Sequence, residues 1–593
     1  MTELEGKVLD KKQLELKVSS IQGEVALIKS QISASLQRSH VNSINVKGVS
    51  TRKVEDLFNN PEIICKKRRT TKPTKIFYGM ASNIFKHAFL IFRTYLDLFI
   101  DIIFGYWFDG QSGYVPRLDE EHKILTHSAV ELAKMIRTKK LKSEELVRIC
   151  IERITIVNPL INAVTDQRFE EALKEAKQFD VMIEEGLPSE YFKSKPFLGV
   201  PFTAKESHAV AGLLHTLGLA SRRHVRATED AECVRLLKEA GAIALAVTNV
   251  PELNKWQETR NLVFGQTNNP HRAGRTAGGS SGGEAALAAC YGTPIALCSD
   301  IGGSTRMPAF YCGLYAHNPT AGFTSLKGSL LRTGEEDTMA SIGFVSRCLG
   351  DLAPLTAVVA GGRAPGLQLD RRVDLQNVKY YYVETAQDLR VSPICKDLRD
   401  TMSRAITALS PSKPKKYYHR GFDYMYTLWR HAMTKEEGNF AALLTNNQGE
   451  ANGILELFRK LVGQSEYTGA AILKLLDDQV LPRVDPEWAD NLIKELREDL
   501  LSTLGDDGVL VFPSAPLPAP QHYAPFARPY NFAYWAVLNV LRLPATQVPL
   551  GRLSEEKLPL GLQLVAGPRQ DALCLAVAGL LERCCGGVVP PCL

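Results

Sequence analysis

Two serine clusters lie in one glycine-rich segment, residues 278–306, which reads GGSSGGEAALAACYGTPIALCSDIGGSTR. Glycine loses the most backbone entropy on folding, so this density indicates tight turns or a close approach of the backbone to another group. The AALAAC and PIALC runs between the clusters are apolar, unlike a flexible linker. The segment is therefore expected to be packed and to present serine hydroxyls, which become nucleophiles when a base takes their proton.

The sequence context favours the second cluster as the site of a nucleophile. The first cluster satisfies the GxSxG pattern formally, with Ser281 at its centre, but that motif requires a strand leading directly into the turn and a histidine partner. The preceding TNNPHRAGRTA is not a buried strand. The apolar run PIALCSDI, in contrast, leads directly to Gly302, Gly303 and Ser304. Backbone N–H groups at such a turn can stabilise an oxyanion, each by about 3 kcal/mol in the transition state.

The candidate base is Lys205, which follows the apolar run FLGVPFTA. An ordinary lysine has a pKa of about 10.4 and is neutral in about one molecule in 2,500 at pH 7. Removing its proton at this pH therefore costs about 4.6 kcal/mol of free energy. Burial at the end of a strand would lower that pKa, because desolvation disfavours the charged form. A lone lysine is usually a surface or ion-paired residue, so Lys205 gains weight only together with the serines.

The elements that must position these residues indicate an α/β domain from about residue 118. SAVE at 128–131 is a capping box, and SEELVRICIERI at 143–154 indicates a second helix. Apolar runs bounded by glycine and proline then predict strands buried on both faces of a helix-covered sheet. They are FLGVPFTA, IALAVTNV at 243–250, PIALCSDI at 294–301, GVLVFPSA at 508–515 and LGLQLVAG at 560–567. Residues 370–500 are more polar and resemble an insertion or lid.

These motifs together resemble the amidase signature family. GGSSGGEAAL followed by SDIGGSTRMPA is similar to its signature, GVPFTAKES to its lysine motif, and GAIALAVTNVPEL and FGQTNNP to the segments between. The spacings agree as well, with 75 residues from Lys205 to Ser280 and 24 from Ser280 to Ser304. The tail, NVLRLPATQVPLG and LPLGLQLVAGPRQDALCLAVAGLLE, extends the likeness over residues 115–590. The resemblance implies an α/β fold over residues 111–593, with a mixed, mostly parallel central sheet covered by helices on both faces.

The resemblance also implies a Ser-Ser-Lys triad. Ser304 would attack an amide carbonyl, Ser280, on a cis peptide in the family, would relay the proton to the leaving amine, and Lys205 would be the ultimate base. Water would then hydrolyse the acyl-enzyme. The implied oxyanion donors are the backbone amides of Ile301, Gly302, Gly303 and Ser304. Ser281 and Arg306 are expected as supporting hydrogen-bond partners, although either could be purely structural, and Asn254 as a pocket-lining residue. The sequence departs from the family pattern at Cys298, Thr305 and Phe344.

Three segments precede this domain. Residues 1–37 carry an apolar heptad seam from Leu14 to Ile32, which predicts a short coiled coil able to hold copies of the chain together, or an amphipathic helix. Residues 38–75 resemble a polar linker that ends in the basic run KKRRTTKPTK. Residues 76–110 contain IFKHAFLIFRTYLDLFIDIIFGYWF, in which the charges fall within a stripe of roughly 80° on a helical wheel.

Residues 76–110 therefore predict an amphipathic helix that lies on or spans an anionic membrane. Its longest charge-free stretches are too short for a straightforward transmembrane helix. The alternative is a helix packed on the globular domain.

Composition limits the other functions. The 593 residues are 45% hydrophobic and 23% charged, which is typical of a globular protein, and the basic run accounts for much of the net charge of +6, so nucleic-acid binding is not indicated. The twelve cysteines have no metal-site spacing, and no secretory signal opens the sequence, so we expect reduced thiols facing the cytosol. No metal or organic cofactor is implied.

Within the family, the amphipathic segment together with GGSSGGE, DIGGSTRMPAF and TQVPLG is most similar to the fatty-acid amide hydrolase branch. That branch cleaves N-acylethanolamines and oleamide, so the resemblance implies a lipid amide substrate and an enzyme on an internal membrane with its catalytic domain facing the cytosol. One alternative is another amidase or the glutaminase subunit of a tRNA-dependent amidotransferase, which would need partner subunits. Another is a catalytically silent membrane scaffold.

Overall fold

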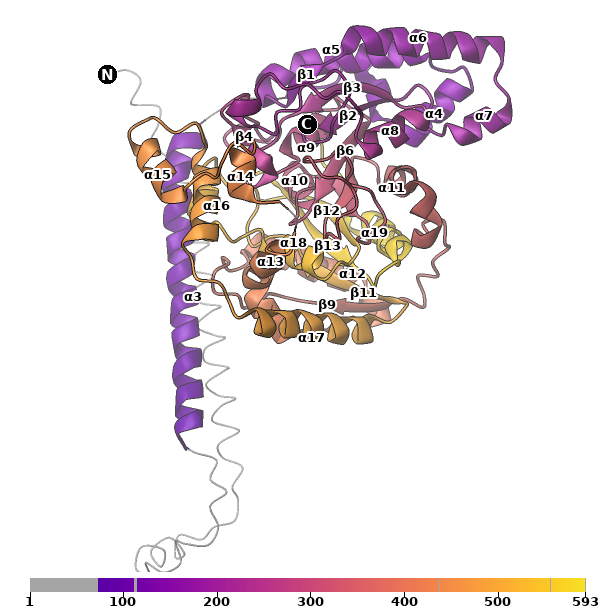
Figure 1. Cartoon of the computed structure of the whole chain (residues 1–593). Coiled ribbons are helices and arrows are strands. Elements are labelled where there is room, and N and C mark those ends of the chain that lie inside the picture. The colour runs from indigo at the N-terminus through magenta and orange to yellow at the C-terminus, as the bar shows by residue number, and fades with distance from the viewer. Residues whose placement is uncertain (1–72, 111–114, 437, 555, 592–593) are drawn as a thin grey trace, which may run out of the picture. The chain divides into compact units, whose positions relative to one another are not determined.

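The computed structural model of the protein describes residues 73–110, 115–436, 438–554 and 556–591 (Figure 1). The chain divides into two compact units, residues 1–102 and 103–593. The predicted heptad seam at residues 14–32 and nearly all of the predicted linker at 38–75 lie outside the described residues.

One long helix, α3 (Pro73–Phe108), covers the segment predicted to be amphipathic. Phe92, Tyr95 and Phe99 are spaced by three and four residues, so they share a face of this helix. Their side chains are 60%, 46% and 59% exposed. Among the helices of the described residues, none combines the length and the hydropathy needed to cross a membrane, so the spanning alternative for residues 76–110 is not met.

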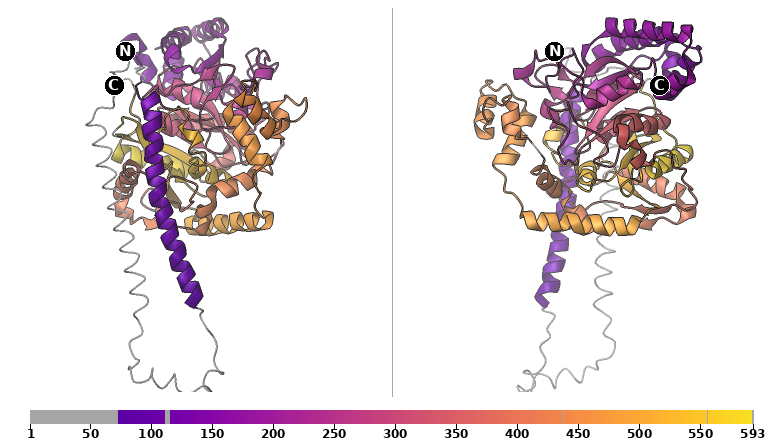
Figure 2. Two further views of the ribbon diagram at one scale, coloured as in Figure 1. Left: turned by 90° about the vertical axis from the view of Figure 1, so that its left-hand side faces the viewer. Right: turned by 45° about the vertical axis from the view of Figure 1, so that its right-hand side comes forward.

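The second unit is built on a mixed sheet in which eleven strands are described (Figures 1 and 2). In spatial order the strands are β1 (Val164–Gln167), β3 (Ile243–Thr248), β2 (Pro201–Lys205), β6 (Ile295–Asp300), β8 (Ser341–Ser346), β7 (Tyr315–Asn318), β12 (Ala545–Leu553), β13 (Pro559–Val565), β11 (Gly508–Pro513), β9 (Lys379–Tyr382) and β10 (Lys415–Lys416). All five apolar runs form strands, which confirms the predicted mixed sheet. Parallel pairs join β3, β2 and β6, and also β11, β9 and β10. Antiparallel pairs run from β6 to β11 between them and join β1 to β3.

Helices surround this sheet, and the capping box predicted at Ser128 and Glu131 is confirmed at the start of α4. The helices are α4 (Ala129–Arg137), α5 (Ser143–Ile161), α6 (Phe169–Glu185), α7 (Ser189–Ser194), α8 (Glu232–Glu239), α9 (Gly282–Ala289), α10 (Arg306–Cys312), α11 (Leu352–Ala360), α12 (Lys396–Ala408), α13 (Met425–Met433), α14 (Phe440–Leu444), α15 (Gly453–Leu461), α16 (Gly469–Gln479), α17 (Pro486–Leu504), α18 (Ala533–Val540) and α19 (Asp571–Cys585). Two short strands, β4 (Arg260–Asn261) and β5 (Gly265–Gln266), pair separately. The segment expected to be an insertion, residues 370–500, supplies helices α12 to α17, strand β9 and the edge strand β10.

The core lies on both faces of the sheet, as β11 shows. Side chains alternate between the faces of a strand. Val509 and Val511 pack in one hydrophobic cluster with residues of α19, whereas Leu510 and Phe512 pack in a second cluster with residues of α10 and α17. Because the side chains on both faces of β11 are buried, its sequence is a continuous apolar run and does not alternate between apolar and polar residues.

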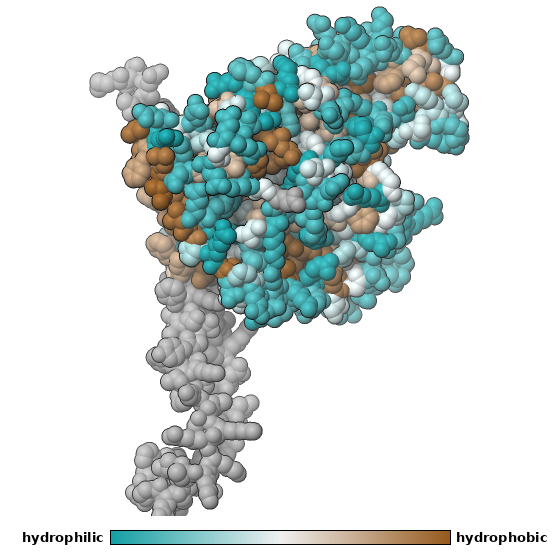
Figure 3. Space-filling model, in the orientation of Figure 1, coloured by the Kyte–Doolittle hydropathy of each residue, from teal (hydrophilic) through white to brown (hydrophobic). Residues whose placement is uncertain are grey.

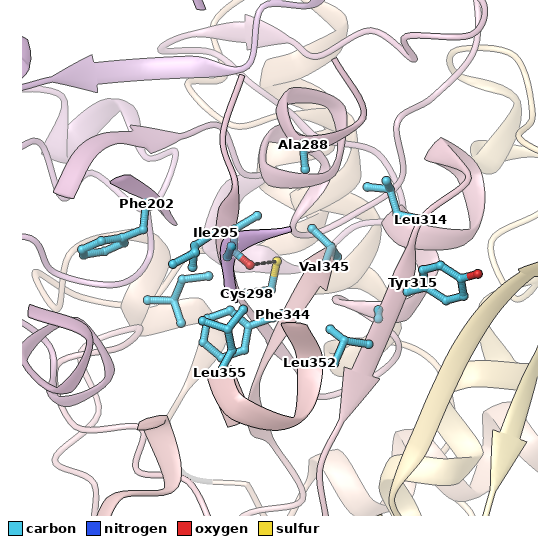
Figure 4. Packing of buried hydrophobic residues seen from close by; sticks show 14 of the residues in the cluster. Phe202, Ala288, Ile295, Cys298, Leu314, Tyr315, Phe344, Val345, Leu352 and Leu355 are labelled. Atoms are coloured by element: carbon cyan, nitrogen blue, oxygen red, sulfur yellow. Dashed lines mark hydrogen bonds between the residues drawn. The ribbon is translucent and has the colours of Figure 1, made fainter. Parts of the chain in front are cut away.

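Two of the departures from the family pattern are core side chains. Cys298 on β6 is fully buried, and its thiol donates to the Ala296 carbonyl over 3.8 Å (Figure 4). Phe344 on β8 lies opposite Leu297 in the strand register and belongs to the same cluster. Both residues therefore belong to strands of the sheet, and neither is part of the turn that follows Asp300.

Leu564→Ala tests this packing. The side chain is fully buried on β13, so we expect its truncation to lower the free energy of unfolding by about 2–5 kcal/mol. Leu457→Ala is the matched control, because Leu457 is 41% exposed on α15 and should lose far less. Urea-induced unfolding followed by circular dichroism measures both. Equal losses in the two variants would contradict the assigned core.

Candidate active site

Lys205 is the last residue of β2, which lies between β3 and β6, and its side chain is only 1% exposed. Its Nζ donates to Ser280 Oγ over 2.8 Å and to Ser299 Oγ over 3.3 Å. Desolvation by burial lowers the pKa of Lys205 to about 8, and the neighbouring thiol and carboxyl groups offset only part of this effect. A neutral amine that can accept a proton is therefore accessible near physiological pH.

The two serine clusters meet in space. The Gly279–Ser280 peptide bond is cis, and α9 begins directly after Ser281. The Ser281 N–H donates to the Ser304 carbonyl over 3.1 Å. The backbone of Ser281 thus holds the first cluster against the second, whereas its hydroxyl has no hydrogen-bond partner among the described residues.

A buried ion pair shapes the turn after β6. The Arg306 guanidinium donates to the two carboxylate oxygens of Asp300 over 3.0 and 3.1 Å, and both side chains are fully buried. Burial alone would raise the pKa of Asp300, but the Arg306 charge and the backbone donors outweigh it and hold this pKa below its ordinary value. Arg306 also donates to Gln563 and Asn539, each over 2.7 Å. It is thus a structural partner of the turn.

The same carboxylate determines which backbone groups can serve an oxyanion. Asp300 accepts the Gly303 N–H over 2.7 Å, so this expected donor is already engaged. The N–H groups of Ile301, Gly302 and Ser304 have no hydrogen-bond partner among the residues that the structure describes. These three amides are therefore available to a ligand.

Glycine is required in this turn for steric reasons. Gly303 has a φ of +104°, and a Cβ there would lie 2.4 Å from Cβ of Trp535. A Cβ on Gly302 would lie 3.0 Å from the indole nitrogen of Trp429, which donates to the Ile301 carbonyl over 3.0 Å. Neither position therefore has room for a side chain.

Lys205, Ser280 and Ser304 all line one small cavity of about 40 Å³. Among the described residues, no hydrogen bond joins the two serine hydroxyls. Lys205 and Ser280 are thus in direct contact, and Ser304 lies in the wall of the same cavity.

Ser304 also lines a second, larger cavity of about 300 Å³, which we call the apolar cavity. Most of its wall is aliphatic or aromatic, and it includes Ile301, Met307, Trp429, Leu476, Tyr530 and Phe532. Asn254 lines both cavities, as expected, and donates to Ser207 over 2.9 Å. The apolar cavity suits an alkyl chain whose reactive end lies at Ser304.

Two residues of the site were not among those expected from the sequence. Ser299 contacts Lys205 and could have been found from its place in SDIGG, one residue before Asp300. Trp429 comes from α13, more than a hundred residues along the chain, and has no local signal. Within the described part of the chain, no group of three or more histidine, cysteine or acidic residues could hold a metal ion.

Comparison with known proteins is consistent with this geometry. The amidase family matches residues 145–423 of the sequence. Human fatty-acid amide hydrolase 2 is 40% identical over 483 residues, which cover 79% of this chain and 91% of that protein. An acylamidase of Rhodococcus erythropolis is 29% identical over 482 residues, covering 77% of this chain and 94% of that protein. A solved structure of fatty acid amide hydrolase has a TM-score of 0.64 at 21% identity, covering 80% of this chain and 87% of that one, which shows the shared fold.

The pH dependence of serine reactivity tests the assignment of Lys205. The rate of reaction with a fluorophosphonate should rise with pH through about 8, because the neutral form of Lys205 increases there. Lys205→Met should slow the reaction by about 10²–10⁴-fold and flatten this rise. Lys494→Met, at an exposed lysine on α17, is the control. A Lys205→Met protein that keeps the wild-type pH profile would remove Lys205 from this role.

Proposed function

This chain belongs to the amidase family and is an amidase, and we propose that it hydrolyses fatty-acid amides at a membrane surface through an acyl-enzyme on Ser304. The observation that carries this proposal is the buried Lys205–Ser280 contact of 2.8 Å in the same cavity as Ser304, which in turn lines the apolar cavity. The Lys205–Ser280 contact provides a base, and the apolar cavity provides space for an acyl chain.

The proposed reaction uses these groups in turn. Neutral Lys205 accepts the proton of Ser280 while Ser280 accepts that of Ser304, and the Ser304 oxygen attacks the amide carbon. The oxyanion accepts hydrogen bonds from the unpartnered N–H groups of the turn after β6. The C–N bond then breaks as Ser280 gives a proton to the amine and takes one back from Lys205, which becomes neutral again. Water attacks the resulting ester, which releases the fatty acid and restores Ser304.

The wall of the apolar cavity favours a fatty acyl group over the small polar side chain of glutamine. Trp429, Leu476 and Phe532 would leave the charged α-amino and carboxylate groups of glutamine without partners on most sides. The similarity to human fatty-acid amide hydrolase 2, the type-2 form, supports the same choice. We therefore rank the glutaminase function second, and a catalytically silent scaffold is not supported for a member of this family.

Exposed apolar side chains support the membrane surface as the place of action. On α15 they are Ile454, Leu455, Leu457, Phe458 and Leu461. Hydrophobic surface, coloured brown in Figure 3, lies in the region where Figure 1 labels this helix. Val480 and Leu481, beyond the end of α16, are 52% and 46% exposed and also line the apolar cavity. An amide dissolved in a bilayer could thus pass from an apolar surface into the cavity. The described cysteines are free thiols, which supports a cytosolic face of an internal membrane.

Substrate hydrolysis tests the proposed activity. The protein should release oleate from oleamide and N-oleoylethanolamine and show little activity on glutamine, because glutamine leaves the apolar cavity empty. Ser304→Ala should lower kcat by about 10⁴-fold or more while leaving the melting temperature near that of wild type. Chromatographic detection of oleate measures both. Faster hydrolysis of glutamine than of oleamide would favour the glutaminase function instead.

Sedimentation with phosphatidylserine-containing vesicles tests the membrane proposal. Phe458→Asp combined with Leu461→Asp should weaken binding by about tenfold or more, because each buried apolar side chain contributes about 1.5–3 kcal/mol. Deletion of residues 76–110 should weaken it as well. The control combines Val181→Asp with Leu262→Asp, which change residues that are 51% and 50% exposed elsewhere. Unchanged sedimentation of both the α15 variant and the deletion would exclude membrane docking by these elements.

A further inference from the structure

Lys255 lies where three cavities meet. It follows β3 and the short helix Glu252–Asn254, and its half-buried side chain lines the apolar cavity and the small cavity that contains Lys205 and Ser280. It also lines a third cavity, of about 550 Å³, which is markedly more polar and which we call the polar cavity. Its side chain is thus placed to touch a molecule bound at Ser304.

Two positively charged side chains line this junction, and each has a nitrogen without a hydrogen-bond partner among the described residues. Among the described residues, no hydrogen bond or ion pair engages the Lys255 ammonium. Arg332 lines the small and polar cavities together with Lys255. Its Nη2 donates to Glu436 over 2.9 Å, but its buried Nη1 has no partner within the described part of the chain. An unpaired guanidinium nitrogen and an unpaired ammonium therefore share one space.

The acidic side chains of the polar cavity already have hydrogen-bond or ion-pair partners, and Glu436 pairs with Arg332 itself, but none of them pairs with the Lys255 ammonium among the described residues. Glu336 accepts the backbone N–H groups of Thr333 and Gly334, Glu436 accepts Thr338 and Met339 as well as Arg332, Glu450 accepts Asn439, and Asp478 pairs with Lys474. Desolvation lowers the pKa of Lys255 to about 7, the positive charges of Lys474 and Arg332 contribute to this lowering, and the negative charges of Glu436 and Asp478 offset part of it. A bound anion would offset this repulsion and favour the charged form of Lys255.

We propose that Lys255 and Arg332 form an anion-binding subsite for the amine portion of the substrate, so that the enzyme favours fatty amides whose amine portion ends in a carboxylate, the class of N-acyl amino acids. This inference rests on the proposed function. With the acyl chain in the apolar cavity, the amine portion extends from Ser304 toward the small and polar cavities, where both cations lie. Hydrolysis then releases the fatty acid and the free amino acid.

Two substrates of nearly equal size isolate the charge. N-oleoylglycine ends in a carboxylate, and N-oleoylethanolamine ends in a hydroxyl two carbons from the same amide nitrogen. Wild type should show the higher kcat/KM for N-oleoylglycine, and Lys255→Met should lower the ratio of the two kcat/KM values by about tenfold or more. Lys255→Arg keeps the charge and should preserve the ratio. Lys494→Met should leave it unchanged. Melting temperature and fluorophosphonate labelling show that each variant is folded.

The possible outcomes distinguish a failure of the anion-binding subsite from a failure of the proposed function. If wild type hydrolyses neither substrate, the proposed function fails and the subsite with it. If wild type hydrolyses N-oleoylethanolamine but the ratio is the same in Lys255→Met, or falls equally in Lys255→Arg, the subsite is wrong while the proposed function stands. The oleate product also carries a carboxylate, so oleate inhibition is measured too. If Lys255→Met changes the inhibition by oleate but not the ratio, Lys255 binds the carboxylate of the product and not that of the substrate, which would overturn the proposal.

Discussion

The site depends on the burial of one lysine. Lys205 ends β2 between two parallel neighbours, where the sheet and its helices exclude water and lower the pKa of the ammonium to about 8. The same burial leaves its amine few partners, so it points to Ser280 at 2.8 Å and to Ser299 at 3.3 Å. Fold and chemistry are thus coupled, since a more exposed lysine would be a common cation instead of a base.

A second buried charge shapes the other side of the site. The Asp300 carboxylate, neutralised by Arg306, accepts the Gly303 N–H and holds the backbone of the turn in place. A buried ion pair of this kind is costly to break, because removing one partner leaves an uncompensated charge. The pair thus fixes the turn, and the N–H groups of Ile301 and Gly302 remain without partners among the described residues. The proposed oxyanion site therefore lies at the end of β6, in the turn that Asp300 holds.

Local patterns in the sequence were enough to predict much of this site. The apolar runs marked β2 and β6, and the residues that follow these strands include Ser304, while Lys205 ends β2. Apolar runs report burial but not direction, which is why the antiparallel middle of the sheet could not be derived from them. The engagement of Gly303 by Asp300 depends on detailed turn geometry. The place of Lys255 depends on segments far apart in the sequence, which the fold brings around one junction.

The central claim is that Ser304, supported by the buried lysine, is the nucleophile of this amidase. Peptide mapping by mass spectrometry after reaction with a fluorophosphonate locates the modified residue directly. The account predicts a single stoichiometric adduct on Ser304, formed by the folded protein and absent after heat denaturation. An adduct on Ser280 or Ser281, or no adduct on the folded protein, would contradict it.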